Sequence, residues 1–243
     1  MIRRWLVNFV LIASSLATQP AWAEQDVVLK AMTDEMKRTE EKLKFESHPT
    51  PYFVSYFVKE IDQVIFSSNL GSPADVACKK ARIVLPDVRI GDYNLDSSNP
   101  LTSIDVNYDE RYLASNNVLD RLPDMTREKP VVSVNEVVKL KIDKEKWSKI
   151  VEVLSAVFKD YPDLQKSKVM MVARSITTWY TNTEGSKVRD SRTSAMLRFY
   201  ASGQAEEGME IVDYEVETAS APGELPPLEQ LKEKVKRFAE QVS

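Results

Sequence analysis

Histidine and cysteine, which often serve as catalytic bases, nucleophiles and metal ligands, are scarce in this sequence. The 243 residues include one histidine, His48, and one cysteine, Cys78. A zinc site of the HExxH type needs two histidines, and a CxxC motif or internal disulfide needs two cysteines, so the sequence excludes all three. A nucleophile–histidine–acid triad could use only His48, and no GxSxG, Walker or GxGxxG motif occurs. We therefore assign no catalytic residue, no metal ligand, no cofactor-binding residue and no cofactor.

For His48 and for Cys78 we favour a structural interpretation over a chemical one. His48 lies directly before Pro49 and Pro51 in a predicted connector, which is typical of a surface or packing histidine. A hydrolase that uses it as a general base stays the alternative. Cys78 follows Val76 and Ala77, as a small half-buried residue would. An intermolecular bridge or a reactive thiol near Lys79 is its alternative.

Alternating oxygen-bearing residues begin at Asp92 and continue with Asn94, Asp96 and Ser98, as at the start of an EF-hand calcium loop. The rest of the pattern fails. Ser97 stands where the loop needs glycine, and Ser103 stands where it needs the bidentate glutamate. We assign no calcium site.

The first 23 residues have the pattern of a secretory signal. Arg3 and Arg4 precede an apolar run over 5–16, and Ala21-Trp22-Ala23 offers a cleavage site before Glu24. The run is shorter than the roughly 20 apolar residues of a spanning helix, so cleavage is favoured over an uncleaved anchor. We expect residues 24–243 to be exported, to the periplasm or outside the cell, with no membrane span after cleavage.

The net charge of −4 argues against a nucleic-acid partner.

Hydrophobic spacing predicts one α+β domain over 24–243, with a largely antiparallel sheet and the order helix, strands, helix, strands, helix. Asp143 is a predicted helix cap, and the Asn182–Gly185 segment is a predicted hairpin loop. The segment 92–130 reads as irregular, because it has no sustained hydrophobic period. The expected helices are 26–45, 143–160 and 228–242. The expected strands are 52–60, 61–70, 81–91, 131–142 (one strand or two short ones), 169–180, 187–200 and 209–218.

Several short segments, in this order along the chain, resemble the N-terminal part of the TldD/PmbA family of metallopeptidases, in particular its exported members. They are Pro51-Tyr52-Phe53-Val54-Ser55-Tyr56, Leu70-Gly71-Ser72, the segment Val88 to Asp96, the segment Leu154 to Pro162, Asn182-Thr183-Glu184-Gly185 and Gly208-Met209. The resemblance implies a domain that helps to form a dimer and the wall of a cavity for an extended peptide. It also implies that the irregular segment 92–130 is shortened, because 97–130 looks shorter than in relatives.

The same resemblance implies what the chain lacks. Family enzymes hold zinc on an HExxxH-type helix and a later cysteine in their C-terminal part, and the sequence stops after the predicted helix 228–242. We therefore predict a non-catalytic domain, from a truncated or split peptidase, that is not an enzyme on its own. Its predicted partners are a second copy or a catalytic chain of the same family, and an extended peptide. The alternative is a free-standing periplasmic binding or scaffold module unrelated to proteolysis.

Overall fold

The computed structural model describes residues 26–43, 50–97, 125–205 and 207–243. The predicted signal peptide (1–23), His48 and most of the segment 92–130 lie outside these residues. Within the described part of the chain, no helix is both long and apolar enough to cross a membrane.

A single six-stranded sheet organises the fold, which confirms the predicted α+β class. The strand order is β2-β1-β4-β5-β3, and β6 pairs with another stretch of the β5 edge. All pairings are antiparallel except that of β3 with β5, which is parallel. The strands are β1 (Phe53–Ser68), β2 (Asp75–Arg89), β3 (Val132–Val134), β4 (Lys166–Asn182), β5 (Lys187–Gln204) and β6 (Glu210–Ala219).

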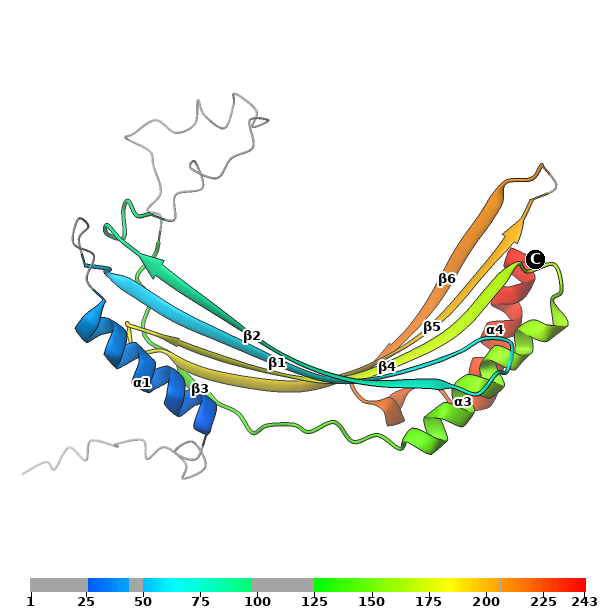
Figure 1. The fold of residues 1–243 in the computed structure, drawn as a ribbon, viewed down its shortest axis with the longest axis horizontal. Helices are drawn as coiled ribbons and strands as arrows, with labels where there is room; N and C mark the ends of the chain where they lie inside the picture. Colours follow the sequence, from blue (N-terminus) through cyan, green and yellow to red (C-terminus); the bar gives the residue numbers. More distant parts are fainter. Residues whose placement is uncertain (1–25, 44–49, 98–124, 206) are drawn as a thin grey trace, which may run out of the picture.

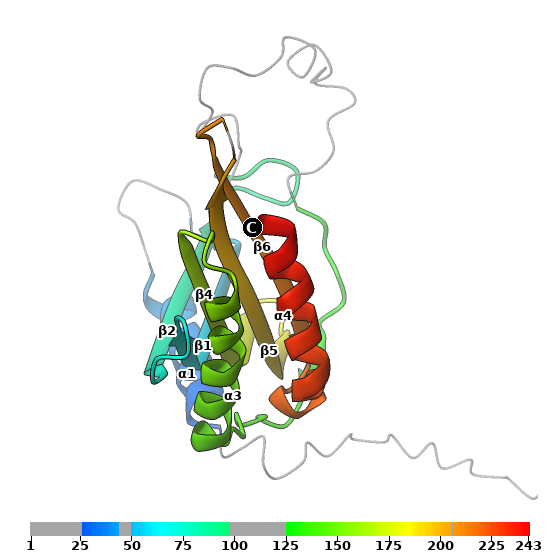
Figure 2. The same ribbon diagram turned by 90° about the vertical axis from the view of Figure 1, so that its right-hand side faces the viewer.

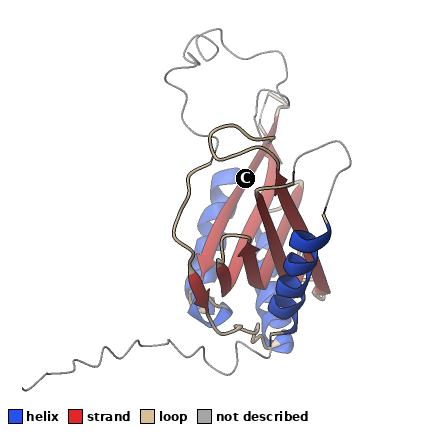
Figure 3. Ribbon diagram, turned by 90° about the vertical axis from the view of Figure 1, so that its left-hand side faces the viewer, coloured by secondary structure: helices blue, strands red, loops and turns tan. Residues whose placement is uncertain are grey.

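The helices all pack on one face of this long, curved sheet, and the concave face opposite carries no described helix (Figure 1). Helices α3 and α4 lie next to each other at one end (Figure 2), and α1 lies at the other end (Figure 3). The helices are α1 (Val27–Lys42), α3 (Lys144–Ala156) and α4 (Leu228–Val242), with short 3-10 turns η2 (Val157–Asp160) and η3 (Pro222–Glu224).

The core has two parts because the helices cover the sheet at its two ends. The larger cluster joins α3 and α4 to alternate residues of the central strands, among them Phe66, Met171 and Phe199. The smaller cluster joins α1 to β1 and β4 through Leu29, Met32, Val58 and Trp179.

The end with α3 also has a buried polar contact. Ser155 Oγ accepts the Gly71 amide at 2.9 Å and lies 2.7 Å from Ser68 Oγ. Gly71 has a φ of +67°, and a Cβ there would come within 2.9 Å of Ala156 Cβ. The turn between β1 and β2 therefore needs glycine both for its backbone and for its close approach to α3.

The predicted helices agree with the structure to within a few residues, and Asp143 caps α3 by accepting the Lys146 amide at 3.0 Å. Two strand predictions are wrong. Residues 61–68 continue β1 instead of forming a second strand, and of the segment 131–142 only Val132–Val134 pairs with the sheet. The preferred interpretation of Cys78 is wrong as well, because its side chain is exposed on β2.

Candidate functional site

A cavity of about 440 Å³ lies at the end of the sheet next to α1. The start of β1, the turn between β4 and β5, the C-terminal end of α1, and segments on either side of residues 98–124 surround it. Its lining residues are Thr39, Glu40, Leu43, Thr50, Pro51, Tyr52, Val54, Tyr93, Arg127, Glu128, Pro130, Thr183 and Glu184.

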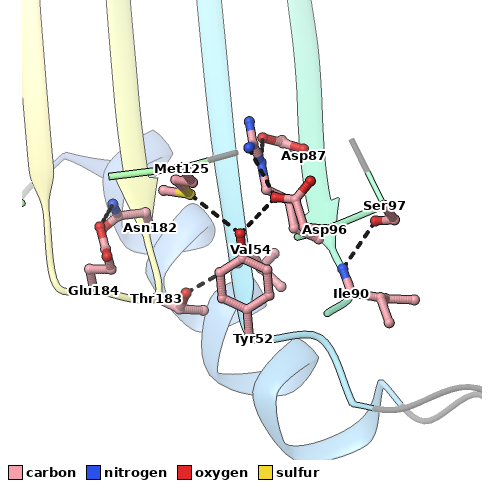
Figure 4. Close-up of polar contacts among 11 residues, drawn as sticks. Tyr52, Val54, Asp87, Ile90, Asp96, Ser97, Met125, Asn182, Thr183 and Glu184 are labelled. Atoms are coloured by element: carbon pink, nitrogen blue, oxygen red, sulfur yellow. Dashed lines mark hydrogen bonds and ion pairs between the residues drawn. The ribbon is translucent and has the colours of Figure 1, made fainter. Parts of the chain in front are cut away.

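Three of the segments that carry the family resemblance meet at this cavity (Figure 4). Tyr52 and Tyr93 contact each other edge to face, with ring centroids 4.9 Å apart. The Tyr93 hydroxyl donates to Glu184 Oε1 at 2.7 Å. Backbone and side chain of Thr183 both bond to Val54, since the Thr183 amide donates to the Val54 carbonyl at 2.9 Å and the Val54 amide donates to Thr183 Oγ1 at 3.1 Å. The hairpin loop is thereby bound to the start of β1.

A buried carboxylate, that of Asp96, contacts the cavity residue Tyr52. The Asp96 side chain has no exposed surface and forms an ion pair with Arg89, at 3.2 Å between Nη1 and Oδ2. The Tyr52 hydroxyl donates to the same Asp96 oxygen at 2.6 Å (Figure 4). Arg89 also pairs with Asp87 at 3.0 Å. The two carboxylates share one guanidinium, which compensates the cost of burying Asp96.

The environment of Tyr52 keeps its hydroxyl protonated. Burial, and then the hydrogen bond to Asp96 and its negative charge, raise the pKa of Tyr52 to about 12. The hydrogen bond to Glu184 also raises the pKa of Tyr93. Both phenols are therefore protonated at neutral pH, and each already donates to a carboxylate.

The calcium-like residues do not converge on one point. Asp92 Oδ1 accepts the amides of Asn94 and Leu95, at 2.7 and 3.1 Å, so Asp92 closes its own turn. The Asp96 side chain instead contacts Arg89 and Tyr52, and Ser98 lies outside the described residues. In the described ranges, no three His, Cys, Asp or Glu side chains are grouped closely enough to hold a metal ion.

We predict that Asp96→Ala destabilises the fold by about 1–3 kcal/mol, because it removes a buried carboxylate that bonds to two half-buried donors, Tyr52 and Arg89. Urea denaturation would measure the change. Asp163→Ala, at an exposed residue on the turn before β4, is the control and should cost less than about 0.5 kcal/mol. Equal losses in the two variants would contradict the structural role of Asp96.

Sequence reasoning did not identify this cavity. The family resemblance, the calcium-like spacing from Asp92 and the hairpin loop at Asn182–Gly185 marked its segments separately, but the contact between Tyr93 and Glu184 joins residues 91 positions apart. The pairing of β1 with both β2 and β4 brings the segments together. The available signal was the concentration of Tyr, Asp and Glu in segments that end or begin strands.

Comparisons with known proteins show the fold. No protein-family model and no curated protein matches the chain. A candidate modulator of a DNA gyrase from Thermotoga maritima MSB8 has a similar structure, with a TM-score of 0.50 and 13% identity, over 88% of this chain and 47% of that one. TldE from Thermococcus kodakarensis gives a TM-score of 0.47 and 12% identity, over 87% of this chain and 47% of its own.

A third structure, a candidate modulator of DNA gyrase from Bacteroides thetaiotaomicron VPI-5482, gives a TM-score of 0.49 and 10% identity. It is matched over 90% of this chain and 49% of its own length. The chain thus spans about half the length of the solved structures that it resembles. At these identities the likeness shows the fold alone.

Proposed function

We propose that this chain is an exported, non-catalytic domain related to the N-terminal half of TldD/PmbA zinc metallopeptidases. In this proposal it is a truncated or split peptidase component that contributes to dimerisation and to the wall of a peptide cavity. The quoted segments, the fold similarity and the single histidine support it. The gyrase role named for two of the similar structures is not carried over, because the leader predicts export away from DNA.

The observation that carries the proposal is the face of the sheet on which none of the described helices packs, which we call the open face. Side chains of β1 and β4 alternate, so that Phe66 and Met171 point to the helices while Ile65 and Val172 point the other way. The open face is rich in apolar residues along its strands. They include Phe57, Ile61 and Ile65 of β1, Ile83 and Leu85 of β2, Val172, Ile176 and Tyr180 of β4, and Met196 and Tyr200 of β5.

An extended apolar surface of this kind is typical of a protein–protein contact. Dimerisation would cover it, with either a second copy or a catalytic chain of the same family as the partner. The cavity beside Tyr52 lies at one end of the same sheet and presents Arg127, Glu40 and Glu128 in its lining. Acidic and basic groups together suit the backbone and termini of a peptide.

The experiment uses the exported protein, purified after removal of its leader. We expect no zinc-dependent, chelator-sensitive peptide cleavage, and we expect Val172→Glu to abolish dimerisation measured by sedimentation equilibrium, because it places a charge in an apolar contact. Val27→Glu is the matched control, since Val27 is 80% exposed at the start of α1.

Chelator-sensitive cleavage by the purified protein would contradict the non-catalytic assignment. A Val172→Glu protein that dimerises like the wild type would contradict the role of the open face. The alternative, a binding or scaffold module unrelated to proteolysis, is favoured if the gene has no neighbouring reading frame that encodes an HExxxH helix.

A further inference from the structure

Two long strands at the edges of the sheet are exposed on both faces. In β2, Leu85 on the open face and Val84 on the helix face are 55% and 56% exposed. In β6, Tyr214 on the open face is 58% exposed and Ile211 on the helix face is 40% exposed. Such strands offer unpaired backbone groups for another strand to bind.

The two edges carry opposite charges. Between residues 76 and 86, β2 has Lys79, Lys80 and Arg82 and no acidic residue. Strand β6 has Glu210, Asp213, Glu215 and Glu217 and no basic residue. Charged residues on an edge usually prevent pairing between copies of that edge. Here they oppose β2 with β2 and β6 with β6, but they favour β2 with β6.

The sheet topology determines how the two edges could meet. Four antiparallel steps separate β2 from β6, through β1, β4 and β5, so the two strands run in the same direction at opposite edges. If a second copy continues the sheet with its helices on the same side, its β2 must lie parallel to the β6 of the first copy.

We propose that β2 of one copy of this chain pairs in parallel with β6 of another, with residues 77–86 beside 210–219. On the helix face this register places Lys80 beside Asp213 and Arg82 beside Glu215. On the open face it places Ala81 beside Tyr214 and Ile83 beside Val216. This register forms two pairs of opposite charge on the helix face and two apolar pairs on the open face, and it places no like charges beside each other. Because the two edges differ, each added copy uses one of its edges and leaves the other free.

The two cations of β2, Lys80 and Arg82, already form ion pairs with acids of their own chain. Lys80 already pairs with Asp62 of β1 at 3.2 Å, and Arg82 Nε donates to Glu60 at 2.9 Å. Pairing with β6 would place each cation between two carboxylates, one from its own copy and one from the next. Asp213 and Glu215 form no ion pair with any described residue of their own chain, although Asp213 Oδ1 accepts the Tyr214 amide at 2.7 Å. Both carboxylates can therefore supply the second negative charge.

The exposed Cys78 gives a test of both the pairing and its register. In the proposed register Cys78 lies beside residue 211, and adjacent strands lie about 4.8 Å apart, within the range that a disulfide bridges. The exported Ile211→Cys protein should therefore form dimers, trimers and higher multimers on mild oxidation, separated on a non-reducing gel. The wild type has one cysteine and can form only dimers.

Val212→Cys is the matched control, because its side chain points to the opposite face of β6. We expect at least about tenfold fewer trimers and higher multimers from this variant than from Ile211→Cys. Equal multimer yields from the two cysteine variants, or no multimers beyond dimers from Ile211→Cys, would overturn the proposed pairing.

Charge variants separate this pairing from dimerisation through the open face. In the Ile211→Cys background, Asp213→Lys with Glu215→Lys should remove the multimers. A charge exchange between β1 and β2 (Glu60→Arg, Arg82→Glu, Asp62→Lys, Lys80→Asp) keeps the internal pairs and should remove them too. Mixing the two proteins should restore cross-linking. Multimers that survive either charge reversal would overturn the proposal, and so would a mixture of the two proteins that does not cross-link. The proposal would also be overturned if adding Val172→Glu to the Ile211→Cys protein removed the multimers.

Discussion

Replacing Asp26 by alanine is expected to lower the free energy of unfolding by about 3–5 kcal/mol, because it leaves a buried arginine without its carboxylate. Asp26 and Arg189 form an ion pair in which both side chains are only 6% exposed. Trp179 Nε1 also donates to Asp26 Oδ2, at 2.7 Å. One carboxylate thus connects α1 to β4 and β5.

The same side chain begins the helix. Asp26 Oδ1 accepts the amides of Val28 and Leu29, at 2.9 and 3.0 Å, and so caps α1. Loss of an N-cap alone costs roughly 0.5–2 kcal/mol. Since the larger core lies at the other end of the sheet, α1 depends on the smaller cluster and on this ion pair. We expect Asp26→Ala to release α1 from the sheet as well as to lower the stability of the whole protein.

Asp26→Asn and Asp34→Ala are the controls for this prediction. The asparagine keeps the cap but loses the charge, so its cost should be intermediate. Asp34 forms an exposed pair with Lys30, so Asp34→Ala should cost least. Urea denaturation measures all three variants, and hydrogen exchange in α1 reports its release. Asp26→Ala and Asp34→Ala proteins of equal stability would contradict the proposed connection.

The pH dependence provides a second measurement on the same residue. Burial alone would raise the pKa of Asp26, but hydrogen bonds from Trp179, the Leu29 amide and Arg189 outweigh it and lower this pKa below its ordinary value of 3.8. A carboxyl whose pKa is lower in the folded state stabilises the fold above its unfolded pKa and loses that contribution as the pH falls. Wild-type stability should therefore decline below about pH 4 more steeply than that of Asp26→Asn.

The helices were predictable because each is specified by local signals. The stripe of Trp147, Ile150 and Leu154 and the cap at Asp143 define α3 without reference to the rest of the chain. β1 was harder, since Glu60 and Asp62 interrupt its apolar alternation. Arg82 and Lys80 of β2 pair with these acids across the strands, and a single sequence does not show that partnership.

The candidate site was less predictable than the fold, for the same physical reason. Asp26 and Arg189 are 163 positions apart, and Tyr52 and Asp96 are 44 apart. Each of these residues has an ordinary local role as a cap, a strand residue or a turn residue. Only the register of the sheet brings the buried carboxylates to their donors, so composition and motif spacing indicated neither the cavity nor the ion pair.

The other end of the sheet depends on apolar packing, and Phe238→Ala tests it. Phe238 of α4 is 2% exposed and meets Phe158 edge to face at 6.4 Å between ring centroids. No side chain caps the start of α4, where Pro227 precedes Leu228, so packing must hold this helix in place. Removing the ring leaves a cavity between α3 and α4, and we expect a cost of about 3–5 kcal/mol.

Two control variants are compared with Phe238→Ala by urea denaturation. Phe238→Leu keeps most of the volume and should cost less than Phe238→Ala, about 1.5 kcal/mol or less. Glu240→Ala, at an exposed residue of the same helix, should change stability by no more than about 0.5 kcal/mol. If Phe238→Ala behaved like Glu240→Ala, α4 would not be part of the cooperative unit. The expected large loss would instead show that the sheet requires α4 to cover its helix face at this end.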